Sequence, residues 1–332
     1  MRVSIAESAD HLAALYGLGP GPWTLRPVAR GATGRVWRLS GEGEGADWAV
    51  KELLFGFDAG QVRDEAALRD AAVARGVPAP RFLASRDGSH TPALPAEFGP
   101  GHVKLYEWVE GVPVEPTAPD VLDWVGATLA RIHLAGVAAR EAPDDWYQRA
   151  PGADDWTRLL ADARAAGAPW AGDLAAFHES SVAALSPHIA PAADDQLLVS
   201  HRDLQPQNVL RDARGPVLLD WDDTGPTTAE RELASVLYMW SGRQRPRAEA
   251  ARRLWRAYRD AGGPGRVRDL DSFSAFLAGT LNFLYVQARD AVNPELGARQ
   301  RAFADAQVPA FLPDMPRSET LSRLVEAVDG TP

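Results

Sequence analysis

Two stretches in the middle of the chain are the most informative part of the sequence. Residues 199–210 read VSHRDLQPQNVL, and residues 218–223 read LLDWDD. Apolar residues on either side of the loop predict two short strands, which would present Asp203, Asn208 and Asp220 together. For any one of these residues, a polar turn capped by its side chain explains the pattern better. The complete spaced set indicates a functional loop.

The three residues suit the transfer of a phosphoryl group from a nucleotide. This reaction needs a carboxylate that orients the attacking hydroxyl and accepts its proton, and Asp203 can fill that role. It also needs hard oxygen ligands for Mg²⁺, which neutralises the phosphates. Because Asn208 and Asp220 can supply such ligands, the sequence predicts a catalytic carboxylate beside a metal site.

The composition is that of an ordinary soluble globular protein. The chain has 332 residues, of which 45% are hydrophobic, and a formal charge of −10. Its length favours two lobes with an active site in the cleft between them. The absence of cysteine excludes disulfides and cysteine nucleophiles. The acidic balance argues against nucleic acid, and no apolar stretch approaches the length of a membrane span, so we expect a cytoplasmic protein.

Lysine is rare in this chain. Of the 35 basic residues counted as lysine or arginine, only Lys51 and Lys104 are lysines. This bias is expected where a GC-rich genome drives lysine codons toward arginine. A lysine that survives this pressure can be one that arginine cannot replace, because a compact charge suits a tight phosphate site better than a wide guanidinium fork. Chance survival explains either lysine alone equally well.

The pattern along the chain predicts a small sheet with one helix, followed by a mostly helical region. The expected strands lie near residues 23–25, 36–39, 48–53, 81–85 and 102–108, with two short ones at 196–200 and 216–220. The expected helices span roughly residues 62–73, 120–135, 154–185, 227–241, 246–261, 271–291 and 318–328. Residues 110–113 mark a break and a candidate linker.

The two central stretches resemble those of known kinases. Residues 201–208 match the catalytic loop of protein kinases, and Asp220 falls where their second metal-binding Asp lies. DWDD replaces their Asp-Phe-Gly, and no Ala-Pro-Glu segment follows, so the chain is more similar to the aminoglycoside phosphotransferase and choline kinase family. GVPAPR at residues 76–81 and EWVEG at residues 107–111 also resemble that family. The resemblance runs from about residue 25 to about residue 290.

The resemblance implies a bilobal protein-kinase-like fold of the α+β class. Residues 1–105 would form an N-terminal nucleotide-binding lobe with a small antiparallel sheet and one helix. Residues 106–111 would be the hinge, and residues 112–332 a larger, mostly helical lobe for catalysis and acceptor binding. The implied cofactors are ATP or GTP and Mg²⁺, with Asp203 as the catalytic residue and Asn208 and Asp220 as metal ligands.

The resemblance also implies which residues hold the nucleotide. Lys51 would contact the α- and β-phosphates and form an ion pair with Glu65, with Glu52, Asp64 and Asp70 as nearby alternatives. The other nucleotide-binding residues would be Val36 and Ala49 above the adenine, Leu210 below it, Tyr106, Glu107, Trp108 and Val109 along its edge, and Gly31, Thr33 and Gly34 over the phosphates. Two alternatives to these nucleotide contacts stay open. Val36, Ala49 and Leu210 could simply be core residues, and residues 31–34 could be a plain hairpin turn.

Three further polar residues are expected to have structural roles. Lys104 is predicted at a solvated strand position. His201 would brace the catalytic loop, as that position does in the family. His133 lies among apolar residues at helical spacing, so we expect a packed core histidine and not a ligand.

The acceptor is the least constrained part of the prediction. Acidic residues are plentiful after residue 111, which suits a cationic acceptor, although a solvated acidic face would look the same. Asp222, Asp223 and Glu230 are the candidate acceptor-binding residues. The sequence therefore predicts a monomeric or weakly dimeric small-molecule kinase that confers resistance by O-phosphorylation of an aminoglycoside or a basic peptide antibiotic.

Two other interpretations of the sequence stay open. One is a kinase that acts on choline, homoserine, a sugar or a macrolide. The other is a pseudokinase that binds nucleotide without turnover. The second is disfavoured because Lys51, Asp203, Asn208 and Asp220 are all present, and degenerate kinases commonly lack at least one of them.

Overall fold

The chain folds into two compact units. The computed structural model describes residues 5–30, 34–42, 47–54, 56–98 and 101–329, so Gly31 and Thr33 of the predicted phosphate loop lie outside the described residues. The first unit comprises residues 1–114 and 207–224, and the second comprises residues 115–206 and 225–332. The predicted lobe boundaries at residues 105 and 111 stay predictions.

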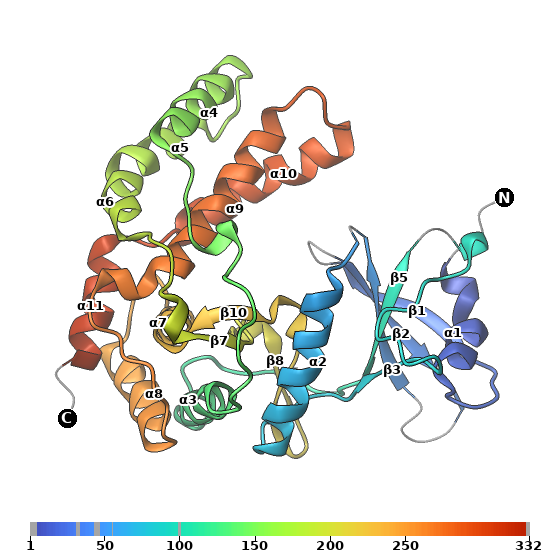
Figure 1. Ribbon diagram of the computed structural model, residues 1–332. Helices are drawn as coiled ribbons and strands as arrows, with labels where there is room; N and C mark the ends of the chain where they lie inside the picture. Colours follow the sequence, from blue (N-terminus) through green and yellow to red (C-terminus); the bar gives the residue numbers. More distant parts are fainter. Residues whose placement is uncertain (1–4, 31–33, 43–46, 55, 99–100, 330–332) are drawn as a thin grey trace. The chain divides into compact units, whose positions relative to one another are not determined.

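The first unit is built on a five-stranded antiparallel sheet (Figure 1). In the order of the sheet, its strands are β1 (Thr24–Arg30), β2 (Gly34–Ser40), β3 (Asp47–Leu53), β5 (His102–Glu107) and β4 (Phe82–Leu83). Two helices accompany the sheet, α1 (Ala9–Tyr16) and α2 (Ala59–Ala74). A second, three-stranded sheet contains β6 (Val112–Pro113), β8 (Val209–Asp212) and β9 (Gly215–Leu218), and the turn η8 (Trp221–Asp223) follows it.

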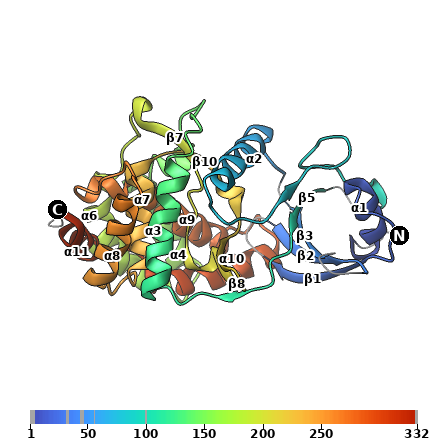
Figure 2. The same ribbon diagram turned by 90° about the horizontal axis from the view of Figure 1, so that it is seen from below.

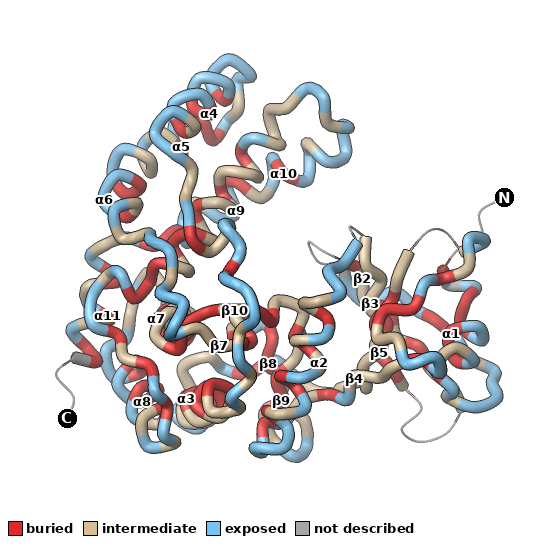
Figure 3. The backbone as a smooth tube through the Cα atoms, in the orientation of Figure 1, coloured by how far each residue is buried: buried red, intermediate tan, exposed pale blue. Residues whose placement is uncertain are grey.

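The two faces of the larger sheet differ in character because side chains alternate along each strand. One face is apolar and packs against α1, as the buried segments in Figure 3 show. Its buried residues include Trp37, Leu39, Trp48, Val50, Val103 and Leu105, which cluster with Leu12 and Tyr16 of the helix. The strand register puts Val36, Ala49, Lys51, Lys104 and Tyr106 on the opposite face. That face therefore carries both lysines of the chain.

The second unit is mostly helical. Its helices are α3 (Pro119–His133), α4 (Ala153–Ala165), α5 (Ala171–Phe177), α6 (Ala183–Leu185), α7 (Ala229–Trp240), α8 (Ala248–Asp260), α9 (Ser274–Val292), α10 (Ala298–Phe311) and α11 (Ser318–Asp329). A two-stranded antiparallel sheet joins β7 (Leu197–Ser200) to β10 (Gly225–Thr228). The predicted α+β class is confirmed.

Two packing arrangements organise the helices of the second unit. Helices α3 and α8 lie side by side (Figure 2), and Gly126 permits their close approach, since a Cβ there would lie 2.3 Å from the Leu254 carbonyl oxygen. Helices α4, α5, α9 and α10 share a core around Trp156 and Leu281. No helix in the described part of the chain is long and apolar enough to cross a membrane.

The sequence predicted most of these elements but not all of them. The helical pattern at residues 154–185 is divided into α4, α5 and α6, with a π-helical turn (His178–Val182) before α6. Helices α1 and α10 and strands β8 and β10 were not predicted. Helix α10 is hard to detect because the buried residues assigned to it are Ala304 and Val308, which leave little apolar periodicity.

Candidate functional site

Lys51 lies on β3 and contacts two carboxylates that follow β9. Its Nζ is 2.7 Å from Asp220 Oδ1 and also forms an ion pair with Asp222 Oδ2. The side chain is largely buried, with 13% of its surface exposed. Burial alone would lower the pKa of Lys51, but the Asp222 and Asp220 carboxylates outweigh burial and raise that pKa. The ammonium group is therefore charged throughout the physiological range.

Glu65 does not pair with Lys51, and in this respect the prediction is wrong. Its Oε2 lies 2.5 Å from Nζ of Lys104, and its Oε1 accepts a hydrogen bond from the Tyr106 hydroxyl. Lys104 is buried, with 4% of its surface exposed, so the predicted solvated position is also wrong. Burial raises the pKa of Glu65, and Lys104 opposes this effect. The strand register explains both errors, because Lys104 lies opposite Lys51 on the same sheet face and takes the carboxylate.

Asp222 connects the two lysines. Its Oδ1 lies 2.8 Å from Lys104 Nζ, its Oδ2 pairs with Lys51, and its carbonyl oxygen accepts a hydrogen bond from the Gln61 side chain at 2.9 Å. Burial would raise the pKa of Asp222, but the two lysines lower it. These contacts favour a role beside the lysines over the predicted acceptor-binding role. We call the following residues the lysine cluster: Lys51, Glu65, Lys104, Tyr106, Asp220 and Asp222.

Asn208 and Asp220 come from neighbouring segments of the same unit. The amide of Leu219 donates a hydrogen bond to the Asn208 carbonyl oxygen at 2.8 Å, and Val209 pairs with Leu218 in the sheet. Asn208 is buried, whereas 43% of the Asp220 side chain is exposed. An amide and a carboxylate are the hard oxygen donors that Mg²⁺ prefers, so this donor set fits the predicted ion. Among the described residues, no group of three or more His, Asp or Glu side chains is suited to a metal.

The predicted adenine-packing residues of the sheet lie on the face that carries Lys51. Val36 pairs directly with Lys51, Ala49 is two residues before it, and both side chains are half-buried. Gly34 is fixed by the sheet itself, because a Cβ there would lie 2.6 Å from the Glu52 carbonyl oxygen. The close approach of β3 therefore explains this glycine without a nucleotide.

Residues 107–109, which begin at the last residue of β5 and which we call the connector, have two of their three amides already engaged. The amide of Glu107 donates to the Arg81 carbonyl oxygen at 2.9 Å, and that of Trp108 donates to the Asp47 carbonyl oxygen at 3.2 Å. Within the described residues, the amide of Val109 has no hydrogen-bond acceptor. Val109 is therefore the connector residue whose N–H is available to a ligand.

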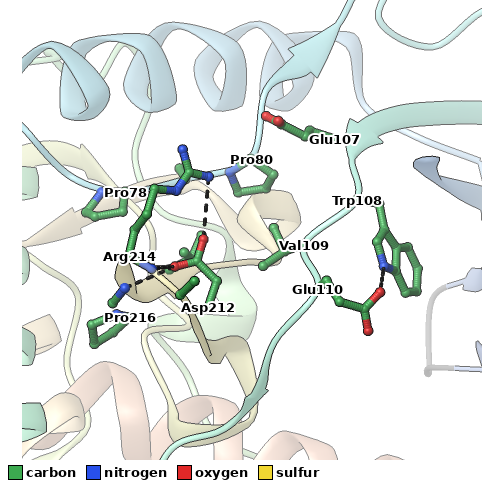
Figure 4. Close-up of a pocket in the computed structure, with 13 residues that line it drawn as sticks. Pro78, Pro80, Glu107, Trp108, Val109, Glu110, Asp212, Arg214 and Pro216 are labelled. Atoms are coloured by element: carbon green, nitrogen blue, oxygen red, sulfur yellow. Dashed lines mark hydrogen bonds and ion pairs between the residues drawn. The ribbon is translucent and has the colours of Figure 1, made fainter. Parts of the chain in front are cut away.

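A pocket of about 580 Å³ adjoins the connector (Figure 4). Its walls come from residues 78–80, 107–110 and 212–217. Asp212 and Arg214, which form an ion pair at 3.5 Å, lie in its wall beside Pro216, and Pro78 and Pro80 line it as well. Val36, Ala49 and Leu210 are not among its lining residues. The pocket thus shares the connector with the predicted base site but not the sheet face that carries Lys51.

Asp203 lies in the second unit, in the loop of residues 201–206 that follows β7, which we call the Asp203 loop. Its Oδ1 accepts a hydrogen bond from the Gln205 side chain at 2.8 Å, and its amide donates to His201 Nδ1 at 3.2 Å. The indole N–H of Trp240 donates to the Leu204 carbonyl oxygen at 2.9 Å. His201 is fully buried, in agreement with the bracing role expected for it.

Glu232 supports the backbone of this loop from α7. Its Oε1 accepts a hydrogen bond from the Arg202 amide at 2.7 Å, and its Oε2 lies 2.9 Å from His133 Nε2. The other ring nitrogen of His133 is 2.7 Å from the Tyr258 hydroxyl. Burial would raise the pKa of Glu232, but the contacts with His133, Ser200 and His201 together outweigh burial and lower that pKa. The predicted core histidine is therefore part of a polar chain that reaches the Asp203 loop.

Backbone strain marks both motifs. Of the described non-glycine residues, Arg202, Asp220 and Arg243 have positive φ, at 61°, 56° and 50°. Such conformations cost on the order of 1–3 kcal/mol and persist where the surroundings impose them, most often at functional sites. Two of the three strained residues thus lie in the two stretches that the sequence singled out.

The remaining candidate acceptor residues have different surroundings. Glu230 pairs with Arg268 at 2.7 Å and accepts a hydrogen bond from the Ser272 hydroxyl at 2.7 Å. Asp223 is half-buried on η8. Glu230 is therefore occupied within its own unit, and its binding role stays a prediction.

Comparison with known proteins gives the class of the protein. Residues 24–270 match the model of a phosphotransferase enzyme family, so the chain belongs to this family and is a phosphotransferase, as predicted. None of the curated proteins compared with the chain matches it in sequence.

Solved structures show the same fold. A spectinomycin phosphotransferase in complex with ADP and spectinomycin is similar at a TM-score of 0.68 and 14% identity, over 97% of this chain and 99% of that chain. An amicoumacin kinase in complex with AMP-PNP, Ca²⁺ and its antibiotic has a TM-score of 0.61 at 16% identity, over 95% of both chains. A choline/ethanolamine kinase family protein from Mesorhizobium loti has a TM-score of 0.52 at 18% identity, over 96% of this chain and 98% of that chain. These likenesses confirm the predicted protein-kinase-like fold.

Proposed function

We propose that this phosphotransferase moves the γ-phosphoryl group of ATP or GTP to a hydroxyl of a small cationic acceptor. The observation that carries the proposal is the 2.7 Å ion pair between Lys51 and Asp220. It joins the residue expected to bind phosphates to a residue expected to bind the metal, 169 positions apart in sequence. A purely structural ion pair would not need Asn208 beside it or the strained backbone of Asp220.

The nucleotide site would use residues of the first unit. Lys51 would hold the phosphates, and Asn208 and Asp220 would hold Mg²⁺, which neutralises phosphate charge when it is bound. The free amide of Val109 would donate to the base edge. The other contacts are proposed as the sequence predicted them: Val36, Ala49 and Leu210 would pack on the base, Glu107 and Trp108 would flank its edge, and Gly31, Thr33 and Gly34 would cover the phosphates. The role of Glu65 is revised, because its ion pair is with Lys104 and not with Lys51.

Asp203 would perform the proton transfer. A carboxylate that accepts a hydrogen bond from the acceptor hydroxyl would orient the hydroxyl oxygen and take up its proton. At the same time a bond would form from that oxygen to the γ-phosphorus, and the bond from the γ-phosphorus to the leaving ADP or GDP would break. The Glu232 and Trp240 contacts hold the loop backbone before substrate arrives. A loop held in place in advance favours catalysis, because a general base that is misplaced relative to the hydroxyl accelerates proton transfer much less.

A cationic antibiotic is the acceptor class we favour. The chain carries a formal charge of −10, and the second unit exposes Glu141, Asp144, Asp145 and Asp154. Opposite charge raises the local concentration of a cationic ligand. Asp223 is retained as the candidate contact. Two similar structures are those of a spectinomycin phosphotransferase with spectinomycin bound and of an amicoumacin kinase.

A panel of acceptors tests this proposal. ADP release is measured with Mg²⁺ and ATP or GTP, with aminoglycosides, a basic peptide antibiotic, choline, homoserine, a hexose and a macrolide, and Asp203→Asn is the matched control. We expect release above background with polycationic antibiotics only. Turnover of choline, homoserine, the hexose or the macrolide alone would reject a polycationic antibiotic as the acceptor. Nucleotide binding without any turnover would reject the enzyme and favour a pseudokinase.

A further inference from the structure

The second lysine of the chain lies in an unusual place for a positive charge. Lys104 on β5 is the direct cross-strand neighbour of Lys51 on β3, on the same sheet face. Like charges directly opposite each other destabilise a sheet. Lys104 is nevertheless buried, so its surroundings must compensate both the repulsion and the loss of water.

Two carboxylates provide this compensation in different ways. Glu65 is fully buried and contacts Lys104 at 2.5 Å. Asp222 contacts Lys104 with Oδ1 at 2.8 Å and Lys51 with Oδ2. In the described part of the chain, Asp222 is thus the carboxylate that touches both lysines. The Tyr106 hydroxyl donates to Glu65 and, at 3.2 Å, to Asp222, which ties the carboxylates together.

The Lys104 side of this arrangement is held by packing. The ring of Phe82 stacks on that of Tyr106 with centroids 4.6 Å apart and planes 13° apart. Nζ of Lys104 lies 5.8 Å from the centre of the Phe82 ring. The Gln61 side chain holds the Asp222 backbone at 2.9 Å. Asp222 is therefore fixed by β5 and α2, and it presents its second oxygen to Lys51.

We propose that Lys104 is a positioning residue that acts through Asp222 on Lys51. The proposal rests on the proposed function, because the target of Lys51 is the triphosphate. Once Asp220 serves the metal, Asp222 is the protein carboxylate left to orient Lys51, and Lys104 determines where Asp222 lies. A compact ammonium fits between two carboxylates where a guanidinium fork does not, which also explains why this position is lysine in an arginine-rich chain.

A double-mutant cycle tests the proposal. Lys51→Met, Lys104→Met and the double variant are titrated with a fluorescent ATP analogue and Mg²⁺. We expect Lys104→Met to weaken binding by about tenfold, and to have almost no further effect in the Lys51→Met background, because residues that act through one another are not additive. An equal loss in both backgrounds would overturn the proposal, since it would show that Lys104 acts independently of Lys51.

Two further variants separate positioning from folding. Lys104→Met combined with Glu65→Gln removes the buried pair together, so it should regain most of the melting temperature that Lys104→Met loses, yet stay about tenfold weaker for nucleotide. Wild-type affinity in this double variant would mean that Lys104 merely neutralises Glu65, and would overturn the proposal. Tyr106→Phe, which keeps the ring and removes the hydroxyl, should weaken binding by a smaller factor than Lys104→Met.

The same titrations distinguish this proposal from the proposed function. If Lys51→Met binds nucleotide as tightly as the wild type, the nucleotide site itself is misplaced. If Lys51→Met weakens binding and a folded Lys104→Met does not, the nucleotide site stands and the positioning role falls. Arg253→Met, which removes an exposed ion pair with Asp123 in the second unit, is the control expected to match the wild type.

Discussion

The lysine cluster and the Asp203 loop keep their functional residues in place by different means. The cluster places three carboxylates around two ammonium groups on one sheet face, so opposite charges hold one another. The loop depends on hydrogen bonds to its backbone, with the Glu232 carboxylate accepting one from the Arg202 amide and the Trp240 indole donating one to the Leu204 carbonyl oxygen. Binding a charged triphosphate requires charges that can be redirected, whereas proton transfer requires a carboxylate whose position does not change.

Asp203→Asn should cause the largest loss of turnover and leave nucleotide binding unchanged. An amide keeps the shape of the side chain but cannot accept the hydroxyl proton, so turnover should fall by about 10²–10⁴-fold. Nucleotide affinity should not change, because the lysine cluster is untouched. Parallel ADP-release assays and nucleotide titrations check this, and wild-type turnover in the variant would refute the assignment of Asp203.

Asp220→Asn should impair the lysine cluster and leave the structure of the Asp203 loop unchanged. This variant removes a metal ligand and a partner of Lys51, so both nucleotide affinity and turnover should fall. Loss of an outer partner of a metal site typically costs 10–100-fold, so a direct ligand should cost more than about 100-fold in Mg²⁺-dependent affinity. Titration with and without Mg²⁺ measures it. Equal affinity for the variant and the wild type would exclude Asp220 from the metal site.

Glu232→Gln should alter the Asp203 loop indirectly, because Glu232 holds the backbone of that loop at Arg202. The variant weakens the charged acceptor for the Arg202 amide and the contact with His133, and removing a buried partner of this kind costs about 1–3 kcal/mol of folding stability. We expect denaturant unfolding at a lower midpoint and a reduced kcat, with the KM for nucleotide unchanged. A raised KM for nucleotide with normal kcat would contradict the separation of the two regions.

The same variant should change the response of stability to acid. The pKa of Glu232 is lowered in the folded protein, so its contribution to stability is complete above its unfolded value of about 4.5 and is lost as pH falls below that value. His133, His201 and Tyr258 are the titratable groups around it. Between pH 6 and pH 3, roughly spanning that pKa, stability should therefore fall more steeply for the wild type than for Glu232→Gln. Parallel curves would show that Glu232 does not carry this dependence.

The smallest effect is expected outside both regions. Arg253 forms an exposed ion pair with Asp123 between α8 and α3. Solvent screens such pairs, so Arg253→Met should match the wild type in melting temperature, nucleotide affinity and turnover. A clear loss of turnover would show that the effects of the other variants are not specific to the two regions.

Sequence reasoning was most successful where local pattern decides structure. Alternation of apolar residues predicted the strands around Lys51, and helical spacing predicted α3, α7, α8 and α9 close to their observed bounds. The strand register could not be predicted from the sequence. Lys51 and Lys104 are 53 positions apart and become neighbours only when β3 pairs with β5. The pairing of Glu65 was therefore assigned to the wrong lysine.

The support of the Asp203 loop shows a second limit. His133 and Trp240 have apolar neighbours in the sequence, so the pattern predicts core residues at both positions. The partners of their polar atoms, the Tyr258 hydroxyl for His133 and the Leu204 carbonyl oxygen for Trp240, come close only in the tertiary structure. The strained backbone at Arg202 and Asp220 was not predicted either, since arginine gives no signal of a positive φ, and aspartate, although enriched among residues with a positive φ, adopts it at few positions. The sequence therefore indicated which residues are buried, but not which groups their polar atoms contact.

The most direct test of the whole account is a crystal structure with a non-hydrolysable ATP analogue and Mg²⁺. The account predicts the ion at about 2.0–2.1 Å from oxygens of Asp220 and Asn208. It also predicts Lys51 Nζ at about 2.7–3.2 Å from a phosphate oxygen. A nucleotide bound elsewhere, with Lys51 still paired to Asp220 and no ion at Asn208, would contradict it.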